Sequence, residues 1–147
     1  MPFIDADGTP INVEIEGKAD APVLMFSNSL GTNLHMWDEQ AKALSKHFRI
    51  LRYDQRGHGK SGAPDGIYSI ERLGRDVLAI LNALELPRVH FCGLSMGGMT
   101  GMWLARFASE RFDKLVIANS APKSQTPDSW NARIRAVRAG GIAAIAD

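Results

Sequence analysis

The sequence predicts an α/β protein in which a mainly parallel sheet carries helices on both faces. Strand-like and helix-like segments alternate from residue 23 to residue 119, and such alternation is typical of parallel strands joined by crossover helices. Two segments carry most of this signal. Residues 23–27 (VLMFS) form the short apolar run of a strand buried on both faces. Residues 70–84 place apolar side chains at the spacing of an amphipathic helix.

A hairpin is predicted ahead of these elements. Residues 11–15 alternate between apolar and polar side chains, which is the pattern of a half-buried strand. Asp7-Gly8 precedes this strand and is a strong turn signal. The residues around Phe3 should therefore pair with it.

The remaining elements follow in chain order. Glycine, proline and polar residues predict loops at residues 29–36 and 54–66. Ser69 is placed to cap the long amphipathic helix. Further strands are expected at residues 48–53, 89–92 and 115–118, and helices at residues 37–47, 70–84, 96–108 and 127–139. Thr126 is expected to cap the last helix, and Gly140-Gly141 to end it.

Composition excludes several classes of partner. The chain has 147 residues, enough for one domain, and a net charge of +1, which favours neither nucleic acid nor an anionic membrane. One cysteine cannot form an internal disulfide, and no apolar run is long enough for a signal peptide or a membrane span. No cluster of cysteine, histidine and acidic residues has metal-ligand spacing. We expect a cytoplasmic protein without metal, cofactor, nucleic-acid or membrane partners.

The chemistry is predicted in residues 89–98 (VHFCGLSMGG), which carry G-x-S-x-G between a strand and a helix. In this context the serine lies on a strained turn with its hydroxyl exposed, as a nucleophile. Gly93 and Gly97 would let the chain on either side of Ser95 crowd together. The backbone N–H of Met96, at the helix start, is a ready oxyanion donor. The simpler alternative is a tight turn in which Ser95 only caps the helix.

Three further features belong to this prediction. Gly98, Gly101 and Ala105 are expected to keep the following helix close to the sheet. Cys92, in the strand before the turn, is expected to be a buried structural thiol rather than a nucleophile. Met96, Met99 and Met102 are expected to pack rather than to bind a cofactor.

A second oxyanion donor is expected in the loop after the first parallel strand, residues 28–32 (NSLGT). Leu30 would supply its backbone N–H there, although a leucine packed in an ordinary loop is the alternative. Residues 53–61 (YDQRGHGKS) are interpreted as a structural turn in which Asp54 and Arg56 pair. His58, flanked by glycines in that turn, is not expected to be a catalytic base.

Three motifs resemble the bacterial 3-oxoadipate enol-lactonases, which are α/β-hydrolases of the β-ketoadipate pathway of aromatic catabolism. They are residues 28–38 (NSLGTNLHMWD), 53–61 and 91–101 (FCGLSMGGMTG). The resemblance implies an α/β-hydrolase fold, with residues 1–122 as the amino-terminal part of the core and residues 123–147 as the truncated start of a helical cap. It also implies a serine hydrolase that opens a small lactone, 3-oxoadipate enol-lactone, to 3-oxoadipate.

The sequence departs from this pattern in one respect. In this fold the catalytic acid and histidine follow the serine along the chain, yet no histidine follows Ser95. Of the later acids only Asp128 stays open as a triad member. We therefore expect a complementary carboxy-terminal segment that carries the acid and the histidine. Alternatives are a carboxylesterase or perhydrolase-like enzyme, and an inactive fragment that binds a complementary chain.

The last predicted helix offers a substrate contact. Trp130 and Arg133 share one side of it, and the lactone implied by the resemblance has a carboxylate that an arginine can bind. Arg135 points away from that side. The alternative is that the arginines of this helix form a solvated face.

Overall fold

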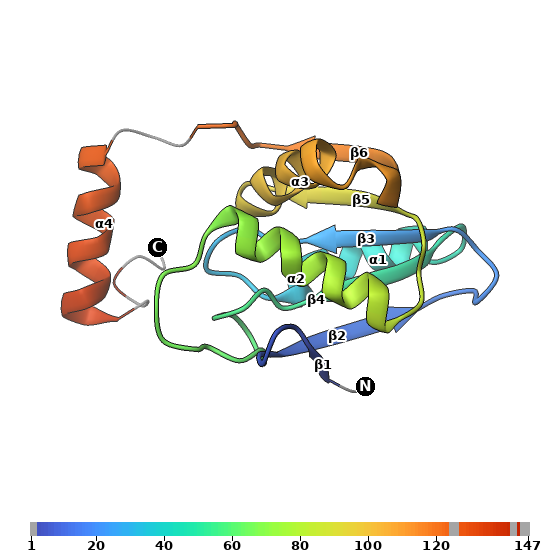
Figure 1. Cartoon of the computed structure of the whole chain (residues 1–147), viewed down its shortest axis with the longest axis horizontal. Coiled ribbons are helices and arrows are strands. Elements are labelled where there is room, and N and C mark those ends of the chain that lie inside the picture. The colour runs from blue at the N-terminus through green and yellow to red at the C-terminus, as the bar shows by residue number, and fades with distance from the viewer. Residues whose placement is uncertain (1–2, 124–126, 142–143, 145–147) are drawn as a thin grey trace.

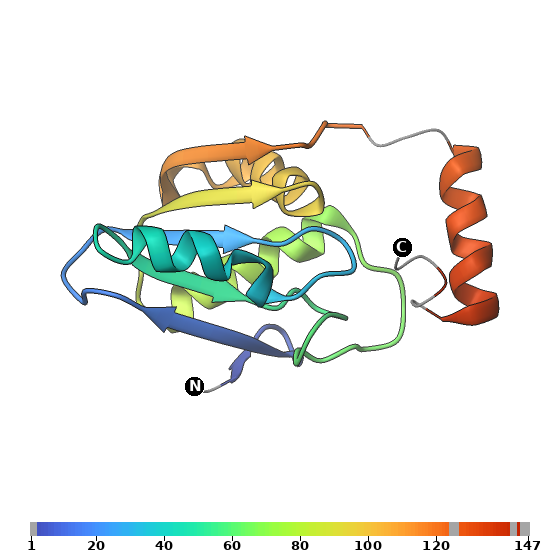
Figure 2. The same ribbon diagram turned by 180° about the vertical axis from the view of Figure 1, so that it is seen from behind.

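The computed structural model describes residues 3–123, 127–141 and 144. It contains one six-stranded sheet with helices on both faces (Figures 1 and 2). The strands are β1 (Phe3–Asp5), β2 (Pro10–Glu16), β3 (Val23–Ser27), β4 (Arg49–Tyr53), β5 (Val89–Leu94) and β6 (Phe112–Ala118). The helices are α1 (Asp38–Leu44), α2 (Ile70–Ala83), α3 (Met96–Phe107) and α4 (Pro127–Gly140), with short 3-10 helices at Leu34–Trp37 and Ser109–Arg111. The predicted α/β class is confirmed.

The strand order β1-β2-β4-β3-β5-β6 determines where a site can form. Strands β4, β3, β5 and β6 run parallel, whereas β1 and β2 are antiparallel to their neighbours. From β3 the chain first crosses to β4 on one side, and later to β5 on the other. Such a reversal opens a crevice beyond the carboxyl ends of the two central strands, which here are β3 and β5.

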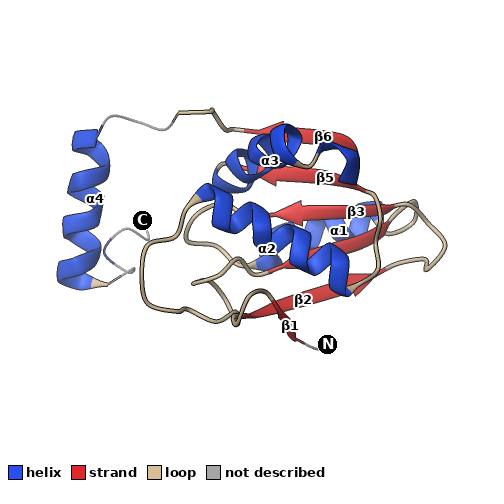
Figure 3. Ribbon diagram, viewed as in Figure 1, coloured by secondary structure: helices blue, strands red, loops and turns tan. Residues whose placement is uncertain are grey.

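Each face of the sheet packs against its own helices, as Figure 3 shows. Helices α2 and α3 cover one face, where Val77 and Leu104 contact a core that includes Phe91. Helix α1 covers part of the other face, where Phe26 stacks on Trp37 with 4.5 Å between ring centroids. Burial of these apolar side chains provides the main favourable term in folding.

The predicted loop at residues 29–36 and the helix after it were partly wrong. A 3-10 helix forms at Leu34–Trp37, because the side chain of Asn33 accepts a hydrogen bond from the backbone N–H of His35 and so starts a helical turn early. Helix α1 follows and ends at Leu44, before the expected residue 47. By contrast, α2 begins at the predicted residue, with Ser69 accepting from the backbone N–H of Arg72.

The predicted Asp54–Arg56 pair was wrong. Arg56 instead binds Asp76 of α2 through two hydrogen bonds of 2.6 and 2.7 Å, and it also donates to the carbonyl of Ala6. Asp54 accepts from the backbone N–H groups of Leu34 and Lys60. It also accepts from the side-chain amide of Asn12 in β2, so three donors other than Arg56 hold its carboxylate. Arg56 ties the turn after β4 to α2 and to the amino-terminal hairpin.

Helix α4 stands beyond the carboxyl ends of the parallel strands, toward which the arrows of β3 and β5 point (Figure 1). It has no buried residue. Gly141, with φ of 71°, follows its last residue and ends it as predicted. Thr126, the expected cap, lies outside the described residues. In the part of the chain that the structure describes, no helix has the length and apolar character needed to cross a membrane.

Candidate active site

Ser95 lies at the turn between β5 and α3, at the carboxyl end of β5, where the strand order reverses. Its φ of 54° and ψ of −112° are strained for a residue with a side chain. Three hydrogen bonds hold this backbone: its N–H donates to Ala118, and its carbonyl accepts from the hydroxyl of Ser120 at 2.7 Å and from the N–H of Met99. Such strain persists only where the surroundings enforce it, which is the feature expected of an exposed nucleophile.

The glycines around Ser95 are required by close backbone contacts. A Cβ atom on Gly93 would lie 2.2 Å from the carbonyl oxygen of Gly97, and one on Gly97 would lie 2.2 Å from the carbonyl oxygen of Ser27. A Cβ on Gly101 would meet Ile117 of β6 at 2.7 Å. The predicted crowding and the close helix–sheet approach are confirmed. Ala105 was wrongly included, because it is exposed.

The loop after β3 is held in place by hydrogen bonds of Asn28. The buried Asn28 amide donates to the carbonyl of Tyr53 at 2.8 Å, and its oxygen accepts from the indole N–H of Trp37 at 2.9 Å. Its backbone carbonyl accepts from the N–H of Gly97, next to the nucleophile turn. This one residue therefore joins the loop to β4, to the 3-10 helix and to the start of α3.

The two predicted oxyanion donors lie on these joined segments. Leu30 is in the loop and Met96 is the first residue of α3. Among the residues that the structure describes, the backbone N–H groups of both have no hydrogen-bond acceptor, as expected for the first donor of a helix. Leu30 is 37% exposed, so it does not pack as a core leucine. Their joint role as an oxyanion hole stays a prediction.

A buried polar network beneath the loop was missed by sequence reasoning. The hydroxyl groups of Ser27 and Tyr53 are 2.8 Å apart, and the Gln55 amide donates to Ser27 at 3.2 Å. Burial raises the pKa of the Tyr53 hydroxyl above its ordinary value, so this group stays protonated. The available signal was that polar residues follow directly on two apolar strands that end at the same edge.

No described histidine is free to act as the base for Ser95. His58 Nε2 already accepts the backbone N–H of Gly31. His35 is exposed and contacts Asp38, and His90 lies within β5 with its ring against Phe48. His47 is exposed just before β4, at the amino end of that strand and so at the opposite edge of the sheet from Ser95. Cys92 is half-buried, and burial raises the pKa of its thiol, as suits a structural thiol. In the part of the chain that the structure describes, no group of three or more histidine, cysteine or acidic side chains is placed to hold a metal ion.

On α4, the guanidinium of Arg133 lies over the ring of Trp130, 5.5 Å from its centroid, so the two do share one side as predicted. Asp128 is exposed in the first turn of the same helix.

The three methionines at residues 96, 99 and 102 are all half-buried along α3, in agreement with a packing role.

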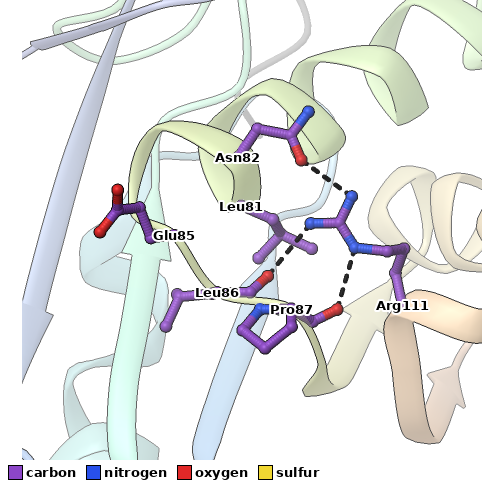
Figure 4. A pocket seen from close by; sticks show the side chains of 6 residues that line it. All are labelled: Leu81, Asn82, Glu85, Leu86, Pro87 and Arg111. Atoms are coloured by element: carbon purple, nitrogen blue, oxygen red, sulfur yellow. Dashed lines mark hydrogen bonds between the residues drawn. The ribbon is translucent and has the colours of Figure 1, made fainter.

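A pocket elsewhere is excluded as the site by its position. It is lined by Leu81, Asn82, Glu85, Leu86, Pro87 and Arg111 (Figure 4). These residues lie just before β5 and β6, at the opposite end of the strands from Ser95. Arg111 donates to Asn82 and to the carbonyls of Leu86 and Pro87. The arginine thus serves to hold the end of α2 to the sheet.

This combination of fold and strained serine turn defines a class of protein. The chain belongs to the α/β hydrolase fold family, whose family model matches residues 22–140. It is 46% identical over 143 residues to 3-oxoadipate enol-lactonase 2 of Acinetobacter baylyi, an alignment that covers 97% of this chain and 54% of that protein. It is 47% identical over 136 residues to 3-oxoadipate enol-lactonase 1 of the same organism, covering 92% and 51%.

A solved structure agrees with these relatives. The crystal structure of the enol-lactonase from Burkholderia xenovorans LB400 is 46% identical and superposes with a TM-score of 0.96, covering 99% of this chain and 57% of that one. The resemblance to enol-lactonases predicted from the motifs is confirmed. The chain spans about half the length of the relatives that it matches.

Proposed function

We propose that this chain supplies the nucleophile and the oxyanion hole of a serine hydrolase that opens 3-oxoadipate enol-lactone to 3-oxoadipate. The observation that carries the proposal is the strained backbone of Ser95, at positive φ between β5 and α3. Within the described part of the chain, the backbone N–H groups of Leu30 and Met96 have no hydrogen-bond acceptor. The proposed substrate is taken from the similar proteins, which are enol-lactonases.

The proposed reaction proceeds in two steps. A histidine takes the proton of Ser95 as its Oγ attacks the lactone carbonyl, and the N–H groups of Leu30 and Met96 stabilise the oxyanion. The ring C–O bond then breaks, and the enol oxygen leaves with a proton from the histidine. Water, activated by the same histidine, hydrolyses the acyl-enzyme and releases the second carboxylate. The freed enol then tautomerises to the ketone of 3-oxoadipate, its O–H proton being lost as a proton is added at carbon.

The histidine and its acid are proposed to come from a complementary carboxy-terminal segment. Among the described strands, β6 pairs on one side only, and Val116 and Ile117 on it are 55% and 38% exposed. An unpaired edge with exposed apolar side chains is suited to accept another strand. This chain together with that segment is called the complete protein below.

A single cysteine suits a reducing compartment, and we propose that the protein is located in the cytoplasm.

Substrate preference tests this function. The complete protein is expected to hydrolyse the carboxylate-bearing enol-lactone with a kcat/KM about 10- to 150-fold above that for a simple aryl acetate, because the lactone carboxylate adds a charge-assisted contact of about 1.5–3 kcal/mol. Initial rates with both substrates measure this. Faster turnover of the aryl ester would identify a carboxylesterase instead, and turnover of neither would refute the proposal.

Arg133 of α4 is proposed to bind that carboxylate, as part of a cap that begins within residues 123–147 and faces a core of residues 1–122. Arg133→Met in the complete protein should raise KM for the lactone about 10- to 100-fold with little change in kcat, because it removes a charged hydrogen-bond donor. Trp130, on the same side, would flank the substrate. Arg135→Met, on another side of the helix, is the matched control and should leave KM unchanged. Equal effects of the two substitutions would contradict the role of Arg133.

A further inference from the structure

The imidazole of His58 joins the glycine-rich turn after β4 to the loop that carries Leu30. Its Nε2 lies 3.0 Å from the backbone nitrogen of Gly31, and its Nδ1 lies 3.1 Å from the carbonyl oxygen of Arg56. We propose that His58 is a positioning residue, which holds the oxyanion loop in its working conformation by accepting the N–H of Gly31.

The two contacts define the state of the ring. A backbone carbonyl can only accept, so the proton must be on Nδ1, and a backbone N–H can only donate, so Nε2 must carry a lone pair. The ring that satisfies both is neutral, with one specified tautomer. His58 in this state cannot take a proton from Ser95 without losing the loop, which separates its role from that of a catalytic base.

The turn that carries the ring is itself held in place. The N–H of His58 donates to the carbonyl of Gln55, and its carbonyl accepts from the N–H of Ser61. The carbonyl of Arg56 accepts the hydrogen bond from the imidazole, and the side chain of Arg56 binds the buried Asp76. The acceptor is therefore presented from a rigid part of the protein.

The loop that His58 contacts has the hydrogen bond and the φ signs of a type II turn. Thr32 N–H donates to the carbonyl of Ser29 at 3.4 Å, Gly31 has φ of 78°, and Leu30 is not among the residues with positive φ. In a type II turn the central peptide, here Leu30–Gly31, is rotated by about half a turn relative to type I. The bond from Gly31 to His58 is available only in one of the two orientations.

The orientation of the Leu30–Gly31 peptide that His58 selects affects catalysis, because Leu30 carries the proposed oxyanion donor. The N–H of Leu30 belongs to the preceding peptide, which shares the Cα atom of Leu30 with the central one. Holding the central peptide fixes the ψ angle of Leu30, and this restricts the directions in which the proposed oxyanion donor can point. An oxyanion donor acts only when it is held at the place where charge develops. This step rests on the proposed function, whereas the contact between His58 and Gly31 does not.

The test compares three variants of the complete protein. His58→Ala should lower kcat for the lactone about 10-fold, equal to about 1.4 kcal/mol, with KM within about twofold. His58→Gln should recover most of kcat, since its side-chain oxygen can reach the position of Nε2 as an acceptor. His35→Ala is the control, because the ring of that exposed histidine contacts Asp38, and its backbone N–H, which alanine keeps, donates to the side chain of Asn33.

Two spectroscopic readouts test the contact without any need for turnover. Nitrogen-15 NMR of His58 should show a protonated Nδ1 and an unprotonated Nε2, and hydrogen exchange at the Gly31 amide should be slowed in the wild type and accelerated in His58→Ala. The opposite tautomer, or an unchanged Gly31 amide, would overturn the proposal. So would kcat of His58→Ala within twofold of wild type. If the lactone is not a substrate, the NMR and exchange results still decide the contact, and the failure belongs to the proposed function.

Discussion

Ser95→Ala is expected to reduce kcat of the complete protein for the lactone by at least about 10,000-fold, because the covalent route depends on this one hydroxyl. The residual rate would come from binding and from the N–H groups of Leu30 and Met96, which the substitution leaves in place. Single-turnover rates, with the enzyme in saturating excess over the lactone, measure the loss directly, since they report the chemical steps without product release.

Ser120→Ala is the matched control for this experiment. Ser120 is also a serine at the same edge of the sheet, but its hydroxyl donates to the backbone carbonyl of Ser95. It stabilises the turn and is not proposed to react with substrate. Loss of one such hydrogen bond should change kcat by about 10-fold at most, in line with a net contribution of about 0.5–1.5 kcal/mol. A Ser95→Ala protein that kept more than about one hundredth of the wild-type rate would contradict the nucleophile assignment.

Asp76→Asn is expected to lower the free energy of unfolding of the complete protein by about 3–5 kcal/mol, because it leaves a buried guanidinium without its counter-charge. The Asp76 side chain is 2% exposed and that of Arg56 is 6% exposed. The same carboxylate also accepts from Arg72 of α2. The amide keeps the shape of the side chain, so the measured change reports charge and hydrogen bonding rather than a cavity. Urea denaturation followed by circular dichroism measures it.

Glu71→Gln provides the comparison on the same helix. Glu71 pairs with Arg75 one turn away, and both side chains are more than half exposed. Solvent screening limits such a pair to about 0.3–0.5 kcal/mol. If Asp76→Asn cost no more than Glu71→Gln, the buried pair would not be the support that we infer for the turn carrying His58.

The elements could be predicted from the sequence where a local pattern matched the packing. Helix α2 was expected at residues 70–84 and lies at Ile70–Ala83, because its apolar stripe and its serine cap agree. The turn at Ser95 could be predicted equally well from the sequence, since its glycines lie within two residues of the serine. Both are determined by neighbours along the chain.

The contacts that hold the site could not be predicted in this way. Arg56 is two residues from Asp54 and twenty from Asp76, yet it binds the distant carboxylate, because backbone N–H groups occupy the near one. His58 likewise reaches Gly31, 27 residues earlier. Spacing along the chain indicates which residues are able to pair, but the packing of loops at the sheet edge selects the pair that forms.

The central claim is that Ser95 is an activated nucleophile, and labelling of the complete protein with a fluorophosphonate tests it most directly. Intact-mass spectrometry followed by peptide mapping should find one adduct, on Ser95, because a serine activated by an adjacent base reacts with such probes as it does with an ester. An adduct on another residue, or an unlabelled protein that still hydrolyses the lactone, would contradict the account.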